Sequence, residues 1–298
     1  MTYARSSHAP RAEYQAAPPP VNPVGRREAY AKAAREAGDR PTFARMENRH
    51  VAIPDELVSA LREARRVVVL TGAGVSAESG VPTFREAQTG LWAQYNPEDL
   101  ATPAAFRRNP RLVWEWYAWR REMVAGVEPN PGHLALAEME RRVPHFTLIT
   151  QNVDGLHSRA GSRNVLELHG NIARTKCFRE DAIVEHWQGS TIPPLCPRCG
   201  GPLRPDVVWF GEMLPAATLD AAWRAADECD LFLSVGTSAL VQPAASLPFR
   251  ALRRGVGIVE INAESTPLTP HAAWHLRGRS GIILPAMVRQ AWPAGNAS

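Results

Sequence analysis

The sequence predicts an α/β fold, a Rossmann-like parallel sheet with helices on both faces, and a smaller domain inserted into it. Short, fully apolar runs, which are typical of buried parallel strands, alternate with segments of helical periodicity. The first of these runs leads directly into a glycine-rich turn. Two segments break the alternation, because 86–130 is crowded with aromatic residues and 174–204 holds three of the four cysteines. We expect these two segments to build the inserted domain.

Length and composition exclude several classes of protein. The 298 residues are 45% hydrophobic and 21% charged, which suffices for one large domain or two ordinary ones. No apolar run approaches the roughly 18 residues of a membrane span. The first 30 residues lack the apolar stretch of a secretory signal, and five acidic residues among the first 50 fit a mitochondrial transit peptide poorly. Four cysteines do not make a disulfide scaffold here. We therefore expect a cytoplasmic protein with no membrane partner.

The positive charge of the chain is concentrated at its N-terminal end. Residues 1–50 contain nine basic and five acidic side chains, and this difference of +4 equals the net charge of the whole chain. The neutral remainder argues against nucleic acid as the main ligand. We expect 1–50 to be a flexible extension with one short helix at 26–37. Its role stays open between a solubilising tail and a contact with a partner or nucleic acid.

The ordered domain is expected to span 51–298, with its elements in the following order. A helix over 55–65 carries its apolar residues on one face. Buried strands are expected at 67–70, 146–149, 231–235, 257–261 and 282–284. Further helices are expected at 133–142, 219–226 and 243–253. The larger part of the domain then comprises about 51–85, 146–173 and 205–290, and the smaller part about 86–145 and 174–204.

The glycine-rich turn has a pattern that binds phosphate groups. The run Gly72-Ala73-Gly74 with Ser76 follows the first strand and opens a helix, as the G-x-G-x-x-G/A pattern requires. Glycines let backbone N–H groups approach a phosphate, and the helix N-terminus adds partial positive charge. A plain tight turn is the alternative. No acidic residue ends a second strand about 20 residues later, so this is not an ordinary dehydrogenase unit.

The cysteines in 174–204 have the spacing of a zinc ribbon. Cys196 and Cys199 form a C-x-x-C pair, and Cys177 lies 18 intervening residues upstream. A structural zinc ion has four ligands, and the fourth is open between three residues: Glu180, Asp181 and His186. The alternatives are a metal-free packed knob or a redox pair. Cys229 lies just before a strand and is expected in the core.

Six segments, taken in order, identify a family. They read GAGVSAESGVPTFR at 72–85, TQNVDGLH at 150–157, ELHG at 167–170, DVVWFGE at 206–212, GTS at 236–238 and INAE at 261–264. Over roughly 55–285 the chain resembles the sirtuins, the NAD-dependent protein-lysine deacylases. This resemblance implies that NAD is a co-substrate. Nicotinamide is cleaved from the ribose when the acyl-lysine carbonyl oxygen attacks, and the acyl group ends on ADP-ribose.

The resemblance also implies roles for individual residues. His169 is the general base on a ribose hydroxyl, a task that suits an imidazole. Without the resemblance, a single histidine before a glycine would be interpreted as a packing or turn residue. Asn152 and Asp154 orient the nicotinamide ribose and carboxamide, and Phe84 lies in a loop that closes over NAD. The expected NAD contacts are Gly72, Ala73, Gly74, Ser76, Phe84, Arg85, Trp92, Gln151, Asn152, Asp154, Gly236, Thr237, Ser238, Asn262, Ala263, Glu264 and Ser280. The segment that pairs with the substrate backbone is Val208, Trp209 and Phe210.

The family pattern extends to the metal and to the acyl group. It places a fourth cysteine at position 180, where this chain has Glu180. Tyr117 and Arg120, three residues apart on a predicted helix, share one face, and a guanidinium with a phenol suits a carboxylate. The pair resembles the acidic-acyl motif of the desuccinylase and demalonylase branch, class III, similar to bacterial cobalamin-B-type sirtuins. Ala87 leaves room in the closing loop. Core packing and a solvated face are the alternatives for the pair.

The sequence therefore favours a deacylase for succinyl-, malonyl- and also acetyl-lysine, and three other readings stay open. A protein ADP-ribosyltransferase would use the same nicotinamide cleavage. An oxidoreductase would transfer hydride instead. An NAD-binding module would show affinity without turnover. The expected partners are acyl-lysine proteins or peptides, with no nucleic acid and no membrane, and we expect a monomer.

Overall fold

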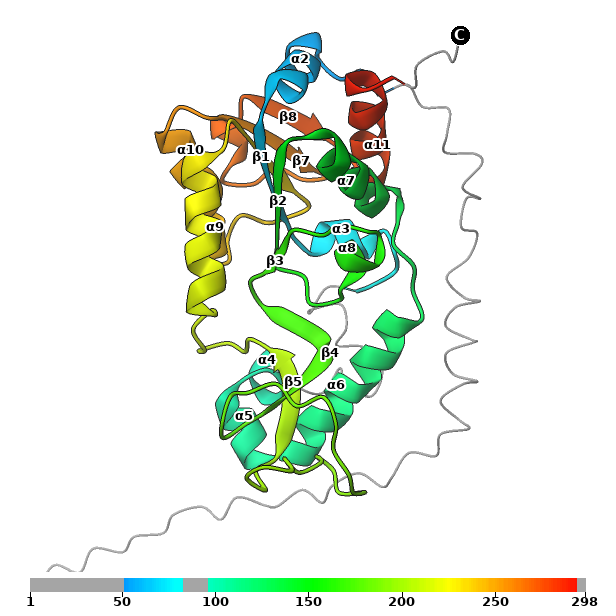
Figure 1. Cartoon of the computed structure of the whole chain (residues 1–298), viewed down its shortest axis with the longest axis vertical. Helices are drawn as coiled ribbons and strands as arrows, with labels where there is room; N and C mark the ends of the chain where they lie inside the picture. Colours follow the sequence, from blue (N-terminus) through cyan, green and yellow to red (C-terminus); the bar gives the residue numbers. More distant parts are fainter. Residues whose placement is uncertain (1–50, 83–95, 294–298) are drawn as a thin grey trace, which may run out of the picture. The chain divides into compact units, whose positions relative to one another are not determined.

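The computed structural model describes residues 51–82 and 96–293 (Figure 1). These residues belong to the larger of two compact units of the chain, His50–Ser298. The expected extension at 1–50 and the expected closing loop with Phe84, Arg85, Ala87 and Trp92 lie outside the described residues.

A six-stranded parallel sheet forms the centre of the larger unit, as the sequence predicts. Its strand order is β3-β2-β1-β6-β7-β8, and every neighbouring pair runs parallel. Val67 of β1 pairs with Phe146 of β2 on one side and with Leu231 of β6 on the other. The strands are β1 Arg66–Thr71, β2 His145–Thr150, β3 Val165–Glu167, β6 Leu231–Val235, β7 Gly257–Asn262 and β8 Trp274–Arg277.

Helices cover both faces of this sheet, since alternate residues of each strand point to opposite sides. Val67 and Val69 face one apolar cluster, whereas Val68 and Leu70 face another. The first cluster includes residues of three helices: α2 Asp55–Glu63, α7 Pro131–Arg142 and α11 Ser280–Ala291. The second includes residues of two more: α9 Ala216–Glu228 and α10 Leu247–Arg253, which a 3₁₀ turn, η3 Ala244–Ser246, precedes. Both faces are therefore buried, which explains why the strands read as continuous apolar runs.

A second group of elements adjoins the strand ends that carry the motifs. Its helices are α4 Pro97–Leu100, α5 Pro103–Arg108 and α6 Pro110–Ala125, and its strands are β4 Gly170–Cys177 and β5 Leu203–Val207. The two strands pair antiparallel in a separate sheet. Helix α6 begins cleanly because the Asn109 side chain accepts the Leu112 N–H and Pro110 takes the first helical position. Its buried residues Trp116 and Tyr117 pack in one cluster with Phe106 and Trp209.

One expected strand of the sheet is wrong, and two observed strands were not expected. The apolar run at 282–284 is not a strand, because Ile283 and Leu284 lie buried inside helix α11. Three apolar residues cannot distinguish a buried strand from one buried face of a helix. Strands β3 and β8 were not expected, and both are short, only partly buried edge strands with a weak apolar pattern. No helix in the described ranges is both long enough and apolar enough to cross a membrane.

Candidate active site

The predicted site residues gather where four parallel strands end. Thr71, Thr150, Val235 and Asn262 are the last residues of β1, β2, β6 and β7. Because these strands run parallel, the segments that follow them meet at one edge of the sheet, the edge where open α/β folds bind ligands. Two short helices begin there, α3 Ala73–Ala77 and α8 Leu156–Arg159 (Figure 1).

The glycine turn packs tightly against the end of β6. The Gly72 N–H donates to Val235 O at 3.1 Å, and the Gly74 N–H donates to Gly236 O at 2.8 Å. A Cβ on Gly74 would lie 2.8 Å from the Gly236 Cα atom, and Gly236 itself has φ +59°. Glycine is therefore required on both sides of this contact for steric reasons. The glycine turn and the 236–238 segment therefore pack directly against each other.

Asn152 connects the end of β2 to the start of α3. Its side-chain amide donates to Gly72 O and to Ser76 Oγ, both at 2.9 Å. Its backbone N–H donates to Thr150 Oγ1 at 3.0 Å. The Asn152 side chain is buried, so these bonds fix its position.

Asp154, Arg120 and Tyr117 form a buried group of interacting polar side chains. Burial raises the pKa of Asp154, while the hydrogen bonds from Leu156 and Ser76 and the charge of Arg120 act in the opposite direction. Burial lowers the pKa of Arg120, and the charges of Tyr117 and Asp154 oppose this. Arg120 is only 8% exposed. The alternative interpretation, in which Arg120 belongs to a solvated helix face, is therefore wrong.

His169 lies half-buried between β3 and β4, with one ring nitrogen engaged. Its Nδ1 is 2.9 Å from Gln151 O, and a carbonyl oxygen only accepts, so Nδ1 carries the proton of the neutral ring. Nε2 is then the basic nitrogen. Burial lowers the pKa of His169, and the hydrogen bond that its ring donates to Gln151 O limits this decrease. Gly170 follows with φ +79°, where a Cβ would lie 2.2 Å from Asp206 O.

Thr237 connects the remaining strand ends. Gln151 Nε2 donates to Thr237 Oγ1 at 3.0 Å, and Asn262 Nδ2 donates to Thr237 O at 3.1 Å. The Ala263 N–H bonds to Asn262 Oδ1, which shapes the turn after β7. Thr237 is buried, whereas the neighbouring Ser238 is exposed.

Two expected NAD contacts lie at the margins of this constellation. Ser280 is buried at the start of α11, where its hydroxyl donates to Glu78 Oε1 at 2.6 Å. Glu264 is exposed and pairs with Arg277 at 3.6 Å. Among the described residues, neither side chain forms a hydrogen bond with another expected site residue.

The expected substrate segment, residues 208–210, has hydrogen bonds to both His169 and Tyr117. The Val208 N–H donates to His169 O at 2.9 Å. Trp209 is buried, and its indole Nε1 donates to Tyr117 Oη at 3.0 Å. Phe210 is 57% exposed. The structure thus brings residues 208–210 into contact with both predicted functional groups.

A buried polar network beneath the site was not predicted from sequence. Thr71 Oγ1 donates to Thr150 Oγ1 at 2.8 Å and lies 2.9 Å from His157 Nε2. The His157 ring lies 4.7 Å from that of His133, and burial lowers the pKa of His133 to about 4 and that of His157 to about 3. The sequence offered one signal for this network: Thr71 and Thr150 are polar residues that end two apolar strands.

The cysteine group has the geometry of a four-ligand metal site. One ligand atom from each of Cys177, Glu180, Cys196 and Cys199 lies within 4.8 Å of all the others. Three thiolates with one carboxylate form a donor set that suits zinc. Of the other candidates for the fourth ligand, Asp181 pairs instead with Lys176 at 2.7 Å, and His186 is not part of the group. Cys229 is buried, as expected.

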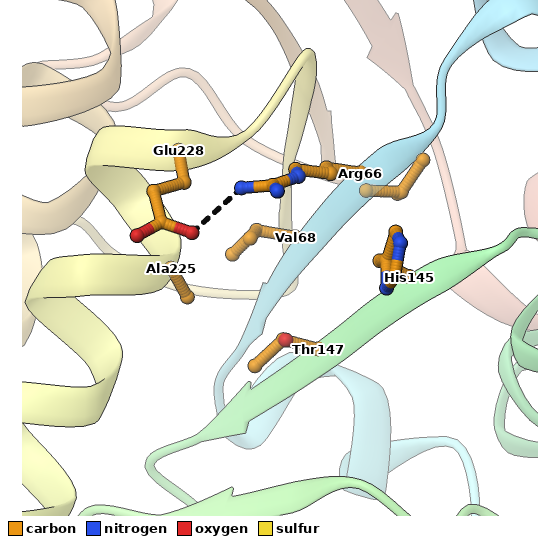
Figure 2. Close-up of a pocket in the computed structure, with 7 residues that line it drawn as sticks. Arg66, Val68, His145, Thr147, Ala225 and Glu228 are labelled. Atoms are coloured by element: carbon orange, nitrogen blue, oxygen red, sulfur yellow. Dashed lines mark hydrogen bonds and ion pairs between the residues drawn. The ribbon is translucent and has the colours of Figure 1, made fainter.

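A separate pocket lies at the other end of the parallel strands, where β1 and β2 begin, and none of the expected site residues lines it. Arg66 and His145, the first residues of β1 and β2, line it together with Thr147, and Arg66 pairs with Glu228 of α9 at 2.6 Å (Figure 2).

Comparisons with known proteins agree on one family. A family profile described as "Sir2 family" matches residues 72–243. NAD-dependent protein deacylase 1 of Pseudomonas aeruginosa is 53% identical over 247 residues, which are 80% of this chain and 98% of that protein. NAD-dependent protein deacylase 1 of Archaeoglobus fulgidus is 52% identical over 237 residues, 79% of this chain and 96% of that protein.

Solved structures give the same result. The complex of a Sir2 homologue with NAD superposes with a TM-score of 0.75 at 49% identity and covers 83% of this chain and 98% of its own. The structure of a Sir2 enzyme bound to a myristoylated histone peptide has a TM-score of 0.63 at 37% identity, with coverages of 80% and 97%.

Proposed function

The chain belongs to the Sir2 family and is an NAD-dependent protein deacylase, and we propose that it removes succinyl and malonyl groups, as well as acetyl groups, from lysine side chains. The observation that carries this proposal is the buried position of Arg120 beside Tyr117 and Asp154. A buried guanidinium is a strong, bidentate partner for a carboxylate. A dicarboxylic acyl group ends in such a carboxylate, and an acetyl group does not.

The geometry of Tyr117 and Arg120 supports recognition of a carboxylate. Both side chains come from one face of α6, and the guanidinium lies 5.0 Å above the Trp116 ring. A guanidinium presents a planar fork of N–H donors, and burial strengthens each charge-assisted bond. Burial also raises the pKa of Tyr117 to about 12, so its hydroxyl keeps its proton at neutral pH.

We assign His169 as the general base and the strand ends as the NAD site. The proton on Nδ1 leaves Nε2 to accept a ribose hydroxyl proton, and a lowered pKa keeps the ring neutral and ready for that task. Asn152 and Asp154 would hold the nicotinamide ribose and carboxamide. The turn at 72–74, packed on Gly236, would take the phosphates.

Substrates of this enzyme are proposed to be acyl-lysine proteins or peptides. Relatives have been solved with a myristoylated histone peptide and with a deacetylated peptide. In this chain, residues 208–210 directly follow strand β5 and bond to His169 and Tyr117, which would place a bound peptide beside both residues. The relatives named above are deacylases, so the ADP-ribosyltransferase alternative is not favoured.

The cysteine group is also proposed to hold a structural zinc ion. Cys177, Cys196, Cys199 and Glu180 would hold it at the end of the β4–β5 sheet, where it would stabilise the connection between those strands. Glu180 also forms an ion pair with Arg198 at 3.0 Å. Arg198 lies between the two cysteines of the C-x-x-C pair.

Kinetics with matched peptides test the acyl preference. The ratio of kcat/KM for succinyl- over acetyl-lysine should favour succinyl in the native enzyme. Arg120→Met should lower kcat/KM for the succinyl peptide by about 10–150-fold, because a hydrogen bond to a charged group is lost. Arg111→Met, an exposed change on the same helix, is the control and should leave the ratio unchanged. An equal loss on both peptides would assign Arg120 a structural role and contradict the proposal.

A further inference from the structure

The side chain of Trp209 connects the substrate segment to the acyl-recognition pair. Its indole Nε1 donates to Tyr117 Oη at 3.0 Å, and both residues are buried. The two rings lie 6.2 Å apart at 40°, so the contact joins them through the hydrogen bond rather than through stacking. A shift of residue 209 would therefore displace the Tyr117 hydroxyl.

Trp209 is itself held by a partly buried ion pair. Arg204 donates to both carboxylate oxygens of Glu212, at 2.5 and 2.9 Å, and to Val207 O at 2.6 Å. Glu212 Oε2 also accepts the backbone N–H of Trp209 at 2.8 Å. The Arg204 guanidinium lies 3.3 Å from the centre of the Trp209 ring. This arrangement fixes the backbone and the ring plane of Trp209 together.

The hydrogen-bond chemistry then determines what the Tyr117 hydroxyl can do. An indole N–H only donates, so Tyr117 Oη is the acceptor in that bond. The hydroxyl keeps one proton to donate elsewhere. The charged neighbour, Arg120, is also purely a donor and cannot accept it. Under the proposed function, the terminal carboxylate of an acyl group bound by Arg120 is an acceptor for this proton.

We propose that Trp209 is a positioning residue for acyl selectivity: by donating to Tyr117, it orients the phenol proton toward the carboxylate of an acidic acyl group. The proposal rests on the proposed preference for succinyl and malonyl groups. An acetyl group ends in a methyl and has no acceptor at that place. The oriented hydroxyl therefore discriminates between acyl groups without contributing to deacetylation chemistry.

A double-mutant cycle tests this coupling. Trp209→Phe and Tyr117→Phe should each lower the succinyl-to-acetyl ratio of kcat/KM by about 5-fold, the size of one hydrogen bond. Much of each decrease should be an increase in KM for the succinyl peptide. The double variant should fall little further than either single variant, because both changes remove the same contact. Trp223→Phe, on α9 and packed against Arg250, is the control and should keep the native ratio.

The outcomes separate this inference from the function on which it rests. If the native enzyme does not prefer succinyl over acetyl, the proposed function fails and this inference fails with it. If the native enzyme prefers succinyl but Trp209→Phe keeps the ratio, or the two changes add fully, only the positioning role is overturned. If Trp209→Phe does not fold by circular dichroism, Glu212→Gln replaces it. That variant should lower the same ratio by about 2-fold or more, and an unchanged ratio would overturn the inference.

Discussion

At the scale of single residues, the site rests on polar groups that the interior isolates from water. Thr71, Thr150 and His157 form one hydrogen-bonded group below Asn152. His133 lies against His157, and its Nδ1 accepts the Asn130 N–H at 3.3 Å. Both rings are buried, so a proton on either would be costly. These histidines support the site but do not titrate within it at neutral pH.

This isolation predicts loss of stability in acid. The pKa values of His133 and His157 in the folded state, about 4 and 3, lie below the usual 6.5, so the unfolded chain binds more protons. The free energy of unfolding should fall as the pH drops below 6.5, by about 2 kcal/mol per histidine at pH 5. Urea unfolding at several pH values measures this free energy.

The same experiment on His133→Gln checks the cause. Removing one titrating ring should reduce the pH dependence between 6.5 and 5 relative to the native chain, whatever the variant costs at pH 7.5. Leu134→Ala, an exposed change on the same helix that removes no titratable group, is the control and should keep the native pH dependence. An unchanged slope in His133→Gln would show that other groups cause the acid sensitivity.

His169→Ala should abolish deacylation while the fold persists. The side chain is half-buried, and its recorded hydrogen bond goes to one backbone carbonyl, so its loss should cost little stability. Turnover of NAD with an acyl peptide, measured as nicotinamide release, should fall by at least about 100-fold. Circular dichroism confirms the fold. Substantial turnover in a folded variant would refute the assignment of His169 as the base.

At the scale of elements, the critical contact is the one between the β1–α3 turn and the end of β6. A Cβ on Gly236 would lie 2.6 Å from Val75 N, and the residue has φ +59°. Gly236→Ala should therefore destabilise the fold by more than about 1 kcal/mol and raise KM for NAD. Gly255→Ala is the control for the cost of positive φ alone, because Gly255 has φ +81° but no atom within 4 Å of its added Cβ. Equal effects of both changes would contradict the packing argument.

The proposed zinc site makes a second prediction at this scale. Glu180→Ala should speed zinc loss to a chelator, and Glu180→Cys should slow it, because a fourth thiolate binds zinc more strongly than a carboxylate. Glu185→Ala, an exposed change nearby, is the control. Zinc content and release, followed with a colorimetric indicator, measure the effect. Identical release from all four proteins would exclude Glu180 as a ligand.

The elements also show what the sequence could and could not predict. Long periodic segments and strands buried on both faces were predictable, because their patterns repeat over many residues. The run at 282–284 was misread, since local apolarity does not reveal whether the neighbour is a strand or a helix. Edge strands β3 and β8 were missed because their partners, and not their own residues, determine them.

At the scale of the whole molecule, parallel strand order turns scattered motifs into one site. Segments as distant as 72–76, 151–154 and 236–238 meet because their strands end at one edge. The sequence predicted this meeting through the family resemblance. It could not predict the bonds within the site, such as Trp209 to Tyr117 or Asn152 to Ser76, because these depend on side-chain orientation in the folded chain.

One measurement tests the central claim most directly. The full-length protein is incubated with NAD and an equimolar mixture of one peptide carrying acetyl-, malonyl- or succinyl-lysine, and the products are followed by mass spectrometry. The account predicts nicotinamide, the free lysine peptide, and O-acyl-ADP-ribose, with the succinyl and malonyl peptides consumed ahead of the acetyl peptide. Consumption of the acetyl peptide alone would contradict the role of Tyr117 and Arg120. ADP-ribose attached to protein without loss of any acyl group would contradict the deacylase account itself.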